Sequence, residues 1–243
     1  MKYCKAFATI AAAAIALVVG LDAPAGARAQ TSPQEAARFV EALGSQAVTL
    51  LAAAKSEKPA KKQDALRNLV RESFNLDLTS QFVLGKFWNQ ATPQQRTEFK
   101  DLFTEYLLTN YVRHLGTFKA ETLTIVGSHT VGDQDALVET SIESADGTTN
   151  PVWRVRAGED GKYKIIDVSV DGVSLALTQR REFASVVNRR GLDGLLDLLR
   201  EKLAAQAKTA QWAPRESASH YSLLASMLAS SNVNKIGILL AVK

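Results

Sequence analysis

Apolar residues recur every three or four positions in the first half of the chain and every second position after Gly116. The first spacing places apolar side chains on one face of a helix, and the second places them on one face of a β-strand. We therefore predict four helices before Gly116, the longest running from about Thr92 to Leu115. Four strands are predicted after it, near 120–128, 135–143, 149–157 and 162–170.

Two of the predicted helices begin with a capping sequence. Ser32 has the N-cap residue type, Pro33 suits the first helical position, and Glu35 can bond back to the cap. Thr92-Pro-Gln-Gln95 repeats this pattern at the start of the long helix. These two helix starts are therefore the most sharply defined boundaries in the sequence.

The loops between the strands are too short to hold crossover helices, so the strands should form an antiparallel meander. Helical spacing returns near 174–188 and 191–207, with a break at Arg189-Arg-Gly191. The predicted fold class is α+β: N-terminal helices packed on a twisted four-stranded antiparallel sheet that is followed by C-terminal helices.

The first 29 residues have the form of a cleaved signal peptide. Lys2 and Lys5 precede an apolar run over 8–19, which is too short to span a bilayer, and Ala27-Arg-Ala29 resembles a cleavage site. We predict export, one domain over 30–205 and a loosely structured tail over 206–243. An uncleaved membrane anchor is the alternative for residues 1–29.

Removal of residues 1–29 changes what the composition implies. The formal charge falls from +4 to +2, so the basic balance is weak evidence for a nucleic-acid partner. Cys4 is the single cysteine, and its loss leaves no thiol for a disulfide, a nucleophile or a metal site.

Catalytic signals are sparse. Gly172-Val-Ser-Leu-Ala176 nearly matches a nucleophile elbow, and Asp197 and His220 follow in the order of a serine esterase. That elbow belongs to a parallel sheet, and the final glycine is missing, so Ser174 is better interpreted as a helix N-cap. A pocket isomerase using Asp167 with Tyr106 or Tyr111 is a further alternative.

Metal and nucleotide chemistry has no support in the sequence. The three histidines, His114, His129 and His220, are isolated and lack the spacing of a zinc helix. His114 suits the last turn of a helix, where a cation is favoured. The glycine-rich motifs of nucleotide-binding proteins are missing as well.

Aromatic residues are concentrated between Phe82 and Phe118, where eight of the seventeen lie. Rings on helices that face a sheet can fill a core or line a cavity. Arg180-Arg181 and Arg189-Arg190 follow the sheet, either as solvated helix faces or as a basic rim for a head group or an acidic partner.

The order of these segments resembles the MlaC family of periplasmic lipid-shuttle proteins, also described as toluene-tolerance or ABC-transporter auxiliary proteins, with hopanoid-associated relatives. The resemblance covers about 33–203. It is carried by Phe82-Val-Leu-Gly-Lys-Phe-Trp88, by Thr92-Pro-Gln-Gln-Arg-Thr-Glu-Phe99 with Phe103 and Tyr111, by the segment from Trp153 through Asp171-Gly-Val-Ser174 to Arg180 and Phe183, and by Gly191-Leu-Asp-Gly-Leu-Leu-Asp-Leu-Leu199.

The resemblance implies a nuclear-transport-factor-like fold with a pocket for phospholipid acyl chains. We expect a monomer that needs no cofactor and binds no nucleic acid. The implied role is to ferry lipid in the periplasm between an outer-membrane lipoprotein complex and an inner-membrane ABC transporter complex. Arg180 and Arg181 are the expected rim. The expected lining is Phe82, Phe87, Phe103, Tyr106 and Tyr111 from the helices, with Val138, Trp153, Val155, Ile166 and Val168 from the strands. A serine esterase, an isomerase and an interaction module with a filled core remain alternatives.

Overall fold

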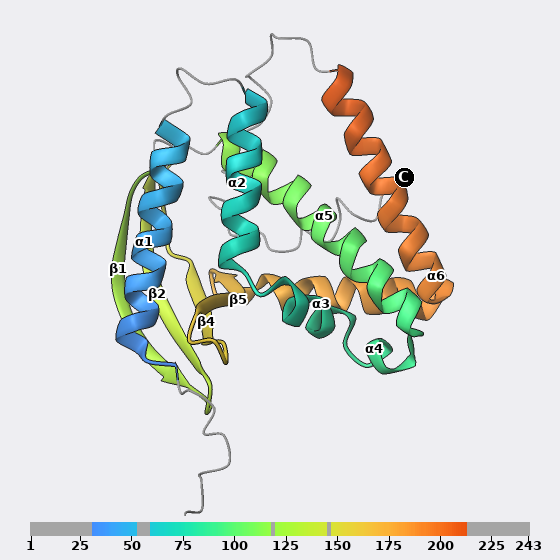
Figure 1. Ribbon diagram of the computed structural model, residues 1–243, viewed down its shortest axis with the longest axis horizontal. Coiled ribbons are helices and arrows are strands. Elements are labelled where there is room, and N and C mark those ends of the chain that lie inside the picture. The colour runs from blue at the N-terminus through green and yellow to red at the C-terminus, as the bar shows by residue number, and fades with distance from the viewer. Residues whose placement is uncertain (1–30, 53–58, 118–119, 145–146, 213–243) are drawn as a thin grey trace, which may run out of the picture.

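The computed structural model describes residues 31–52, 59–117, 120–144 and 147–212 and confirms the α+β class (Figure 1). The predicted signal peptide and most of the predicted tail lie outside these residues. The helices before the sheet are α1 (Pro33–Ala52), α2 (Pro59–Ser73), α3 (Leu76–Leu84), α4 (Phe87–Gln90) and α5 (Pro93–Thr117). The rest are β1 (Ala120–Val131), β2 (Asp135–Ser144), β3 (Gly147–Thr149), β4 (Val152–Ala157), β5 (Tyr163–Val170), β6 (Val173–Ser174) and α6 (Leu175–Trp212).

The N-cap bond forms at both predicted helix starts, but the Glu35 side chain accepts from Arg38 and not from the cap. The amide of Glu35 donates to the Ser32 hydroxyl at 3.4 Å at the start of α1. At the start of α5 the bonds are reciprocal: the Gln95 amide donates to the Thr92 hydroxyl, and the Thr92 amide donates to the Gln95 side chain. These bonds satisfy backbone donors that the first turn of a helix leaves free.

The sheet is the predicted antiparallel meander, with the order β1-β2-β4-β5-β6. The third predicted strand is divided at Asn150-Pro151 into β3 and β4, which both pair with β2. Proline has no amide hydrogen to donate, which accounts for an interruption at this point. The short β6 was not expected; it folds back on β5 through Asp171 and Gly172, which both have positive φ.

A β-bulge in β5 changes which side chains share a face. Trp153 pairs with Val168 and Val155 pairs with Ile165, so an interval of two residues on β4 corresponds to an interval of three residues on β5. Ile166 is the unpaired extra residue. Strict alternation does not survive a bulge, so the register gives no support to our expectation that Ile166 shares a face with Val168.

Helix α1 lies along the β1–β2 side of the sheet (Figure 1). The junction of α2 and α3 contacts β5, where the Asn75 amide donates to the Ile165 carbonyl at 2.8 Å. The Thr79 hydroxyl donates to the carbonyl of Ile166 at 3.3 Å. These bonds occupy backbone acceptors on a strand that would otherwise leave them unpaired.

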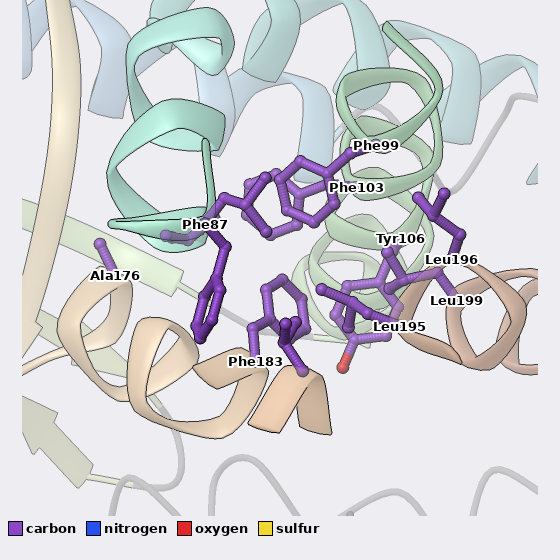
Figure 2. Close-up of a cluster of buried hydrophobic side chains, with 12 residues drawn as sticks. Phe87, Phe99, Phe103, Tyr106, Ala176, Phe183, Leu195, Leu196 and Leu199 are labelled. Carbon is purple, nitrogen blue, oxygen red and sulfur yellow. The ribbon is translucent and has the colours of Figure 1, made fainter. Parts of the chain in front are cut away.

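Helices α3, α4, α5 and α6 enclose an apolar cluster of their own, which we call the helical cluster (Figure 2). The Phe99 and Phe103 rings stack with centroids 5.6 Å apart, and Phe183 meets both edge-on. Phe103 is 1% exposed. The buried members are Val83, Leu84, Phe87, Phe99, Phe103, Tyr106, Ala176, Phe183, Val187, Leu195, Leu196 and Leu199.

Helix α6 changes direction at Gly191, as predicted from Arg189-Arg-Gly191. Gly191 has φ 70° and ψ 177°, a conformation that glycine adopts at little cost. The helix then continues to Trp212, seven residues past the predicted end of the domain at residue 205. None of the helices in the described ranges is both long and apolar enough to cross a bilayer.

Candidate functional site: a partly covered apolar surface on the sheet

A second apolar cluster lies between α1 and the sheet, and it is much less completely buried than the helical cluster. Its buried members are Ala36, Val40, Ala136, Val138, Val155 and Ile165. Around them is a larger set of partly exposed side chains: Ala37, Phe39, Leu43, Phe74, Ile125, Trp153, Tyr163 and Val168. We call this partly exposed set the sheet-side surface.

Hydrogen bonds fix the position of the largest ring on the sheet-side surface. The Trp153 indole N–H donates to the Thr140 hydroxyl at 2.9 Å, and that hydroxyl donates to the Pro151 carbonyl at 3.0 Å. Thr140 is 1% exposed. Because its polar atom is satisfied toward the sheet, Trp153 can present an apolar ring to a ligand without leaving a donor unpaired.

The predicted lining falls into two separate groups. Phe87, Phe103 and Tyr106 belong to the helical cluster, whereas Val138, Trp153, Val155 and Val168 belong to the cluster against the sheet. The structure does not bring these two groups together around one space. Ile166 belongs to neither cluster, and the side chain of Tyr111 lies outside the described residues.

Phe82 lies apart from both groups of the predicted lining. It is 41% exposed, and the guanidinium of Arg180 lies 5.1 Å from the centroid of its ring. Phe82 therefore contacts Arg180 of the predicted rim. The neighbouring Arg181 is exposed.

The sheet-side surface also contains residues that our sequence reasoning did not assign to a lining. Phe39 and Leu43 come from α1, and Tyr163 comes from β5. The Phe39 and Tyr163 rings have centroids 6.4 Å apart. The spacing of apolar residues predicts that one face of α1 and one face of β5 are buried. It does not predict which element covers each face.

Ser174 is a helix cap, as the sequence analysis favoured. Its hydroxyl accepts from the Leu177 amide at 3.0 Å and donates to the Asp167 carboxylate. Asp167 also accepts from the Ala176 amide at 3.0 Å. The groups proposed for an esterase and an isomerase are thus bonded to each other at the start of α6. Asp197 pairs with Arg200, and His220 lies outside the described residues.

Replacing Ser174 with alanine should lower the free energy of unfolding by about 1 kcal/mol, the usual cost of losing an N-cap side chain. Chemical denaturation followed by circular dichroism measures this change. Ser185→Ala, at an exposed position within the same helix, should have little effect. Rapid labelling of Ser174 by a fluorophosphonate probe would contradict the cap assignment and favour an esterase.

The charged side chain with the lowest exposed fraction in the described residues has a structural role. Asp135, at the start of β2, is 2% exposed and accepts from Arg154 at 2.7 Å and from Arg156 at 3.0 Å. Burial alone would raise the pKa of Asp135, but the hydrogen bonds and charges of Arg156 and Arg154 outweigh it and hold the pKa below its usual range. These bonds join the start of β2 to β4.

Metal binding finds no support in the described residues, which hold no group of three or more potential ligands. His129 lies 3.7 Å from Glu139 on the exposed part of the β1–β2 hairpin. Two hollows on the described surface lie along α5, and neither includes a residue of the predicted lining. They are lined by Pro93, Gln94, Thr97, Glu98 and Asp101, and by Arg71, Leu76, Asp101, Thr104 and Glu105.

The protein is of the α+β class. Its helices enclose one apolar cluster, and its sheet carries a second apolar cluster that is only partly covered. Comparison with known proteins is more specific. The family model described as MlaC protein matches residues 41–201, so the chain belongs to the MlaC family.

Individual relatives are distant. The chain is 26% identical over 152 residues to the intermembrane phospholipid transport system binding protein MlaC of Haemophilus influenzae, spanning 58% of this chain and 70% of that protein. It is 24% identical to the toluene tolerance protein ttg2D of Pseudomonas putida, spanning 54% of this chain and 61% of that protein.

A solved structure supports the fold. The phospholipid-binding protein from Ralstonia solanacearum, solved in complex with a phospholipid, superposes with a TM-score of 0.63 at 23% identity. The match covers 71% of this chain and 98% of that one. It confirms that the helices and the antiparallel sheet are arranged as in that protein.

Proposed function

We propose that this protein is a lipid carrier that holds phospholipid acyl chains against the sheet-side surface. The observation that carries the proposal is the contrast between the two clusters. The helical cluster has twelve buried members, filled in by stacked and edge-on rings, and seven partly buried side chains around them, whereas the cluster against the sheet has only six buried members and eight partly buried ones. An apolar surface of this kind is what an acyl chain would cover.

The energetics favour a carrier that works by binding alone. Burying an acyl chain of about 16 carbons gains on the order of 10 kcal/mol, at about 0.8 kcal/mol per methylene. A two-chain lipid would then almost never leave into water. Release requires an apolar path offered by a docked partner or a membrane, and no bond in the lipid has to be broken.

The proposed site of action is the periplasm, between an outer-membrane lipoprotein complex and an inner-membrane ABC transporter complex. The predicted signal peptide over 1–29 supports export. The name of the Haemophilus influenzae relative, which places that protein in an intermembrane phospholipid transport system, supports the role. The proposal includes no cofactor. The names of the relatives describe binding, transport and tolerance rather than a reaction.

Native mass spectrometry of protein purified from the periplasm tests the proposal. We expect a mass increase equal to that of a phospholipid, and lipid extraction should identify it. Leu43→Gln, in a partly exposed position on the sheet-side surface, should reduce the bound fraction strongly. Leu107→Gln is the matched control, because Leu107 is also partly buried on a helix but packs against the helical cluster.

Two results would contradict the proposal. One is protein that carries no lipid from the periplasm and takes up none from vesicles. The other is an equal loss of lipid in the two leucine variants, which would indicate general destabilisation and not a site on the sheet. Chemical denaturation of both variants shows whether they lose similar stability, so that the comparison is fair.

A further inference from the structure

Two of the three large apolar side chains that are exposed in the described residues lie on helices that contact each other. Phe82 near the end of α3 is 41% exposed, and Leu177 near the start of α6 is 39% exposed. Helices α3 and α6 lie side by side in this part of the molecule (Figure 1). A pair of exposed apolar groups on adjacent helices is a candidate contact surface.

Three cations lie on the same two helices or directly after them: Lys86 follows α3, and Arg180 and Arg181 lie on α6. Arg180 and Arg181 follow Leu177 by three and four residues, so all three side chains lie on one side of α6. The Arg180 guanidinium stacks on Phe82 at 5.1 Å, and the ammonium of Lys86 lies 5.1 Å from the Phe87 centroid. Within the described residues none of these cations has a carboxylate partner.

The backbone at Gly85 leaves room for the Arg180 side chain. Gly85, between α3 and α4, has φ 59°, and a Cβ atom there would lie 2.8 Å from the Arg180 Nε. A side chain at position 85 would therefore push the guanidinium off the Phe82 ring. The position of Arg180 over the ring thus depends on a glycine in a left-handed conformation.

We infer that Phe82, Lys86, Leu177, Arg180 and Arg181 form a docking surface for an anionic lipid leaflet, and we call it the basic-aromatic patch. Cations near such a leaflet bind its phosphates, while a ring and an aliphatic side chain enter the interface beside them. An acidic protein is a less suitable partner for this patch. A stable protein interface buries about 800 Å² on each partner, which takes far more than the five residues of the patch.

Docking at this patch goes beyond the carriage of lipid and is tested separately from it. Membrane contact does not require a bound cargo, and a cargo could be carried by a protein that never touches a bilayer directly. The assay below therefore measures attachment to vesicles and not lipid content. A protein that does not attach to vesicles could still carry lipid. A protein that carries no lipid could still attach to vesicles through this patch.

Vesicle flotation with the full exported chain tests the patch. Wild-type protein should bind vesicles made of phosphatidylglycerol and phosphatidylcholine, bind pure phosphatidylcholine much less, and lose binding as salt is added. Each basic residue near an anionic leaflet strengthens binding by about fivefold. Arg180→Gln with Arg181→Gln should therefore weaken binding by about 25-fold.

The matched control is Arg189→Gln with Arg190→Gln, an exposed pair on the same helix. It lies about 13 Å further along the axis, beyond the screening length of about 8 Å at physiological salt, so binding should change little. Arg181→Gln alone should not affect folding, because Arg181 has no hydrogen bond or ion pair with the described residues. This variant therefore tests the patch even if the double variant misfolds. We expect it to weaken binding by about fivefold.

Two outcomes would overturn the inference. Wild-type protein that binds anionic and neutral vesicles equally, or binds neither, has no such surface, and an acidic protein would then be the better occupant. Equal losses in the two double variants would show that binding follows total charge and not the basic-aromatic patch.

Discussion

Replacing Phe103 with alanine is expected to lower the free energy of unfolding by about 4 kcal/mol, since large-to-small changes of buried aromatic residues leave a cavity as well as losing apolar contact. Phe103 is 1% exposed and stacks on Phe99 while meeting Phe183 edge-on. Neighbours held in such an arrangement cannot easily close the space. Chemical denaturation of lipid-free protein measures the change.

The same variant separates a core residue from a lipid contact. If Phe103 belongs to the closed helical cluster, the loss of stability should be the same in lipid-free and lipid-loaded protein. Phe82→Ala is the control, because that ring is 41% exposed and should cost about 1 kcal/mol or less. A loss of stability for Phe103→Ala that appears only with bound lipid would instead place this residue in the cargo site.

Asp135→Asn is expected to cost about 2 to 3 kcal/mol of stability. The substitution removes a buried charge, and breaking a buried ion pair costs about 3 to 5 kcal/mol when both partners are fully enclosed. Here the side chains of Arg154 and Arg156 are 45% and 30% exposed, so water can partly replace the lost carboxylate. Thermal and chemical unfolding at neutral pH measure the effect.

The same carboxylate should make stability depend on pH in a defined direction. The pKa of Asp135 in the folded protein is lower than its ordinary value of 3.8, so the folded state favours the ionised form. Its contribution is fully present above that ordinary value and is lost as the pH falls through the lower pKa of the folded protein. Asp135→Asn should therefore unfold with a weaker dependence on acid.

Glu139→Gln provides the comparison on the same strand. Its carboxylate is half-exposed and lies near His129, so its removal should change stability by about 0.5 kcal/mol or less. If the two variants lose similar stability, or if Asp135→Asn retains the acid sensitivity of the wild type, the buried cluster does not have the role assigned to it.

Local chemistry made the helix boundaries and hairpins predictable. Ser32, Thr92 and Ser174 act as caps because their hydroxyls sit where a first turn has free amides, and this relation involves only a few consecutive residues. The turn at 158–161 is equally local: the Gly158 amide bonds to the Lys162 carbonyl at 2.8 Å. Such features can be read without knowing what the element packs against.

The candidate site was harder to predict because it depends on contacts between distant segments. An apolar stripe on a helix shows that one face is buried, but not whether it faces a sheet or another helix. Phe103 and Trp153 were therefore grouped together, although the first packs among helices and the second on the sheet. The bulge at Ile166 is a matter of hydrogen-bond register, which alternating hydrophobicity does not encode.

The two apolar clusters of the described residues have no member in common, and this has an evolutionary consequence. Effects of substitutions at separate sites are usually additive, so changes around Trp153 and Leu43 need no compensation around Phe99 and Phe103. If the sheet-side surface holds the cargo, as we propose, a lineage can adapt it to a bulkier or more rigid hydrocarbon while the helical cluster stays constant. Cargo preference would then diverge among relatives faster than thermal stability does.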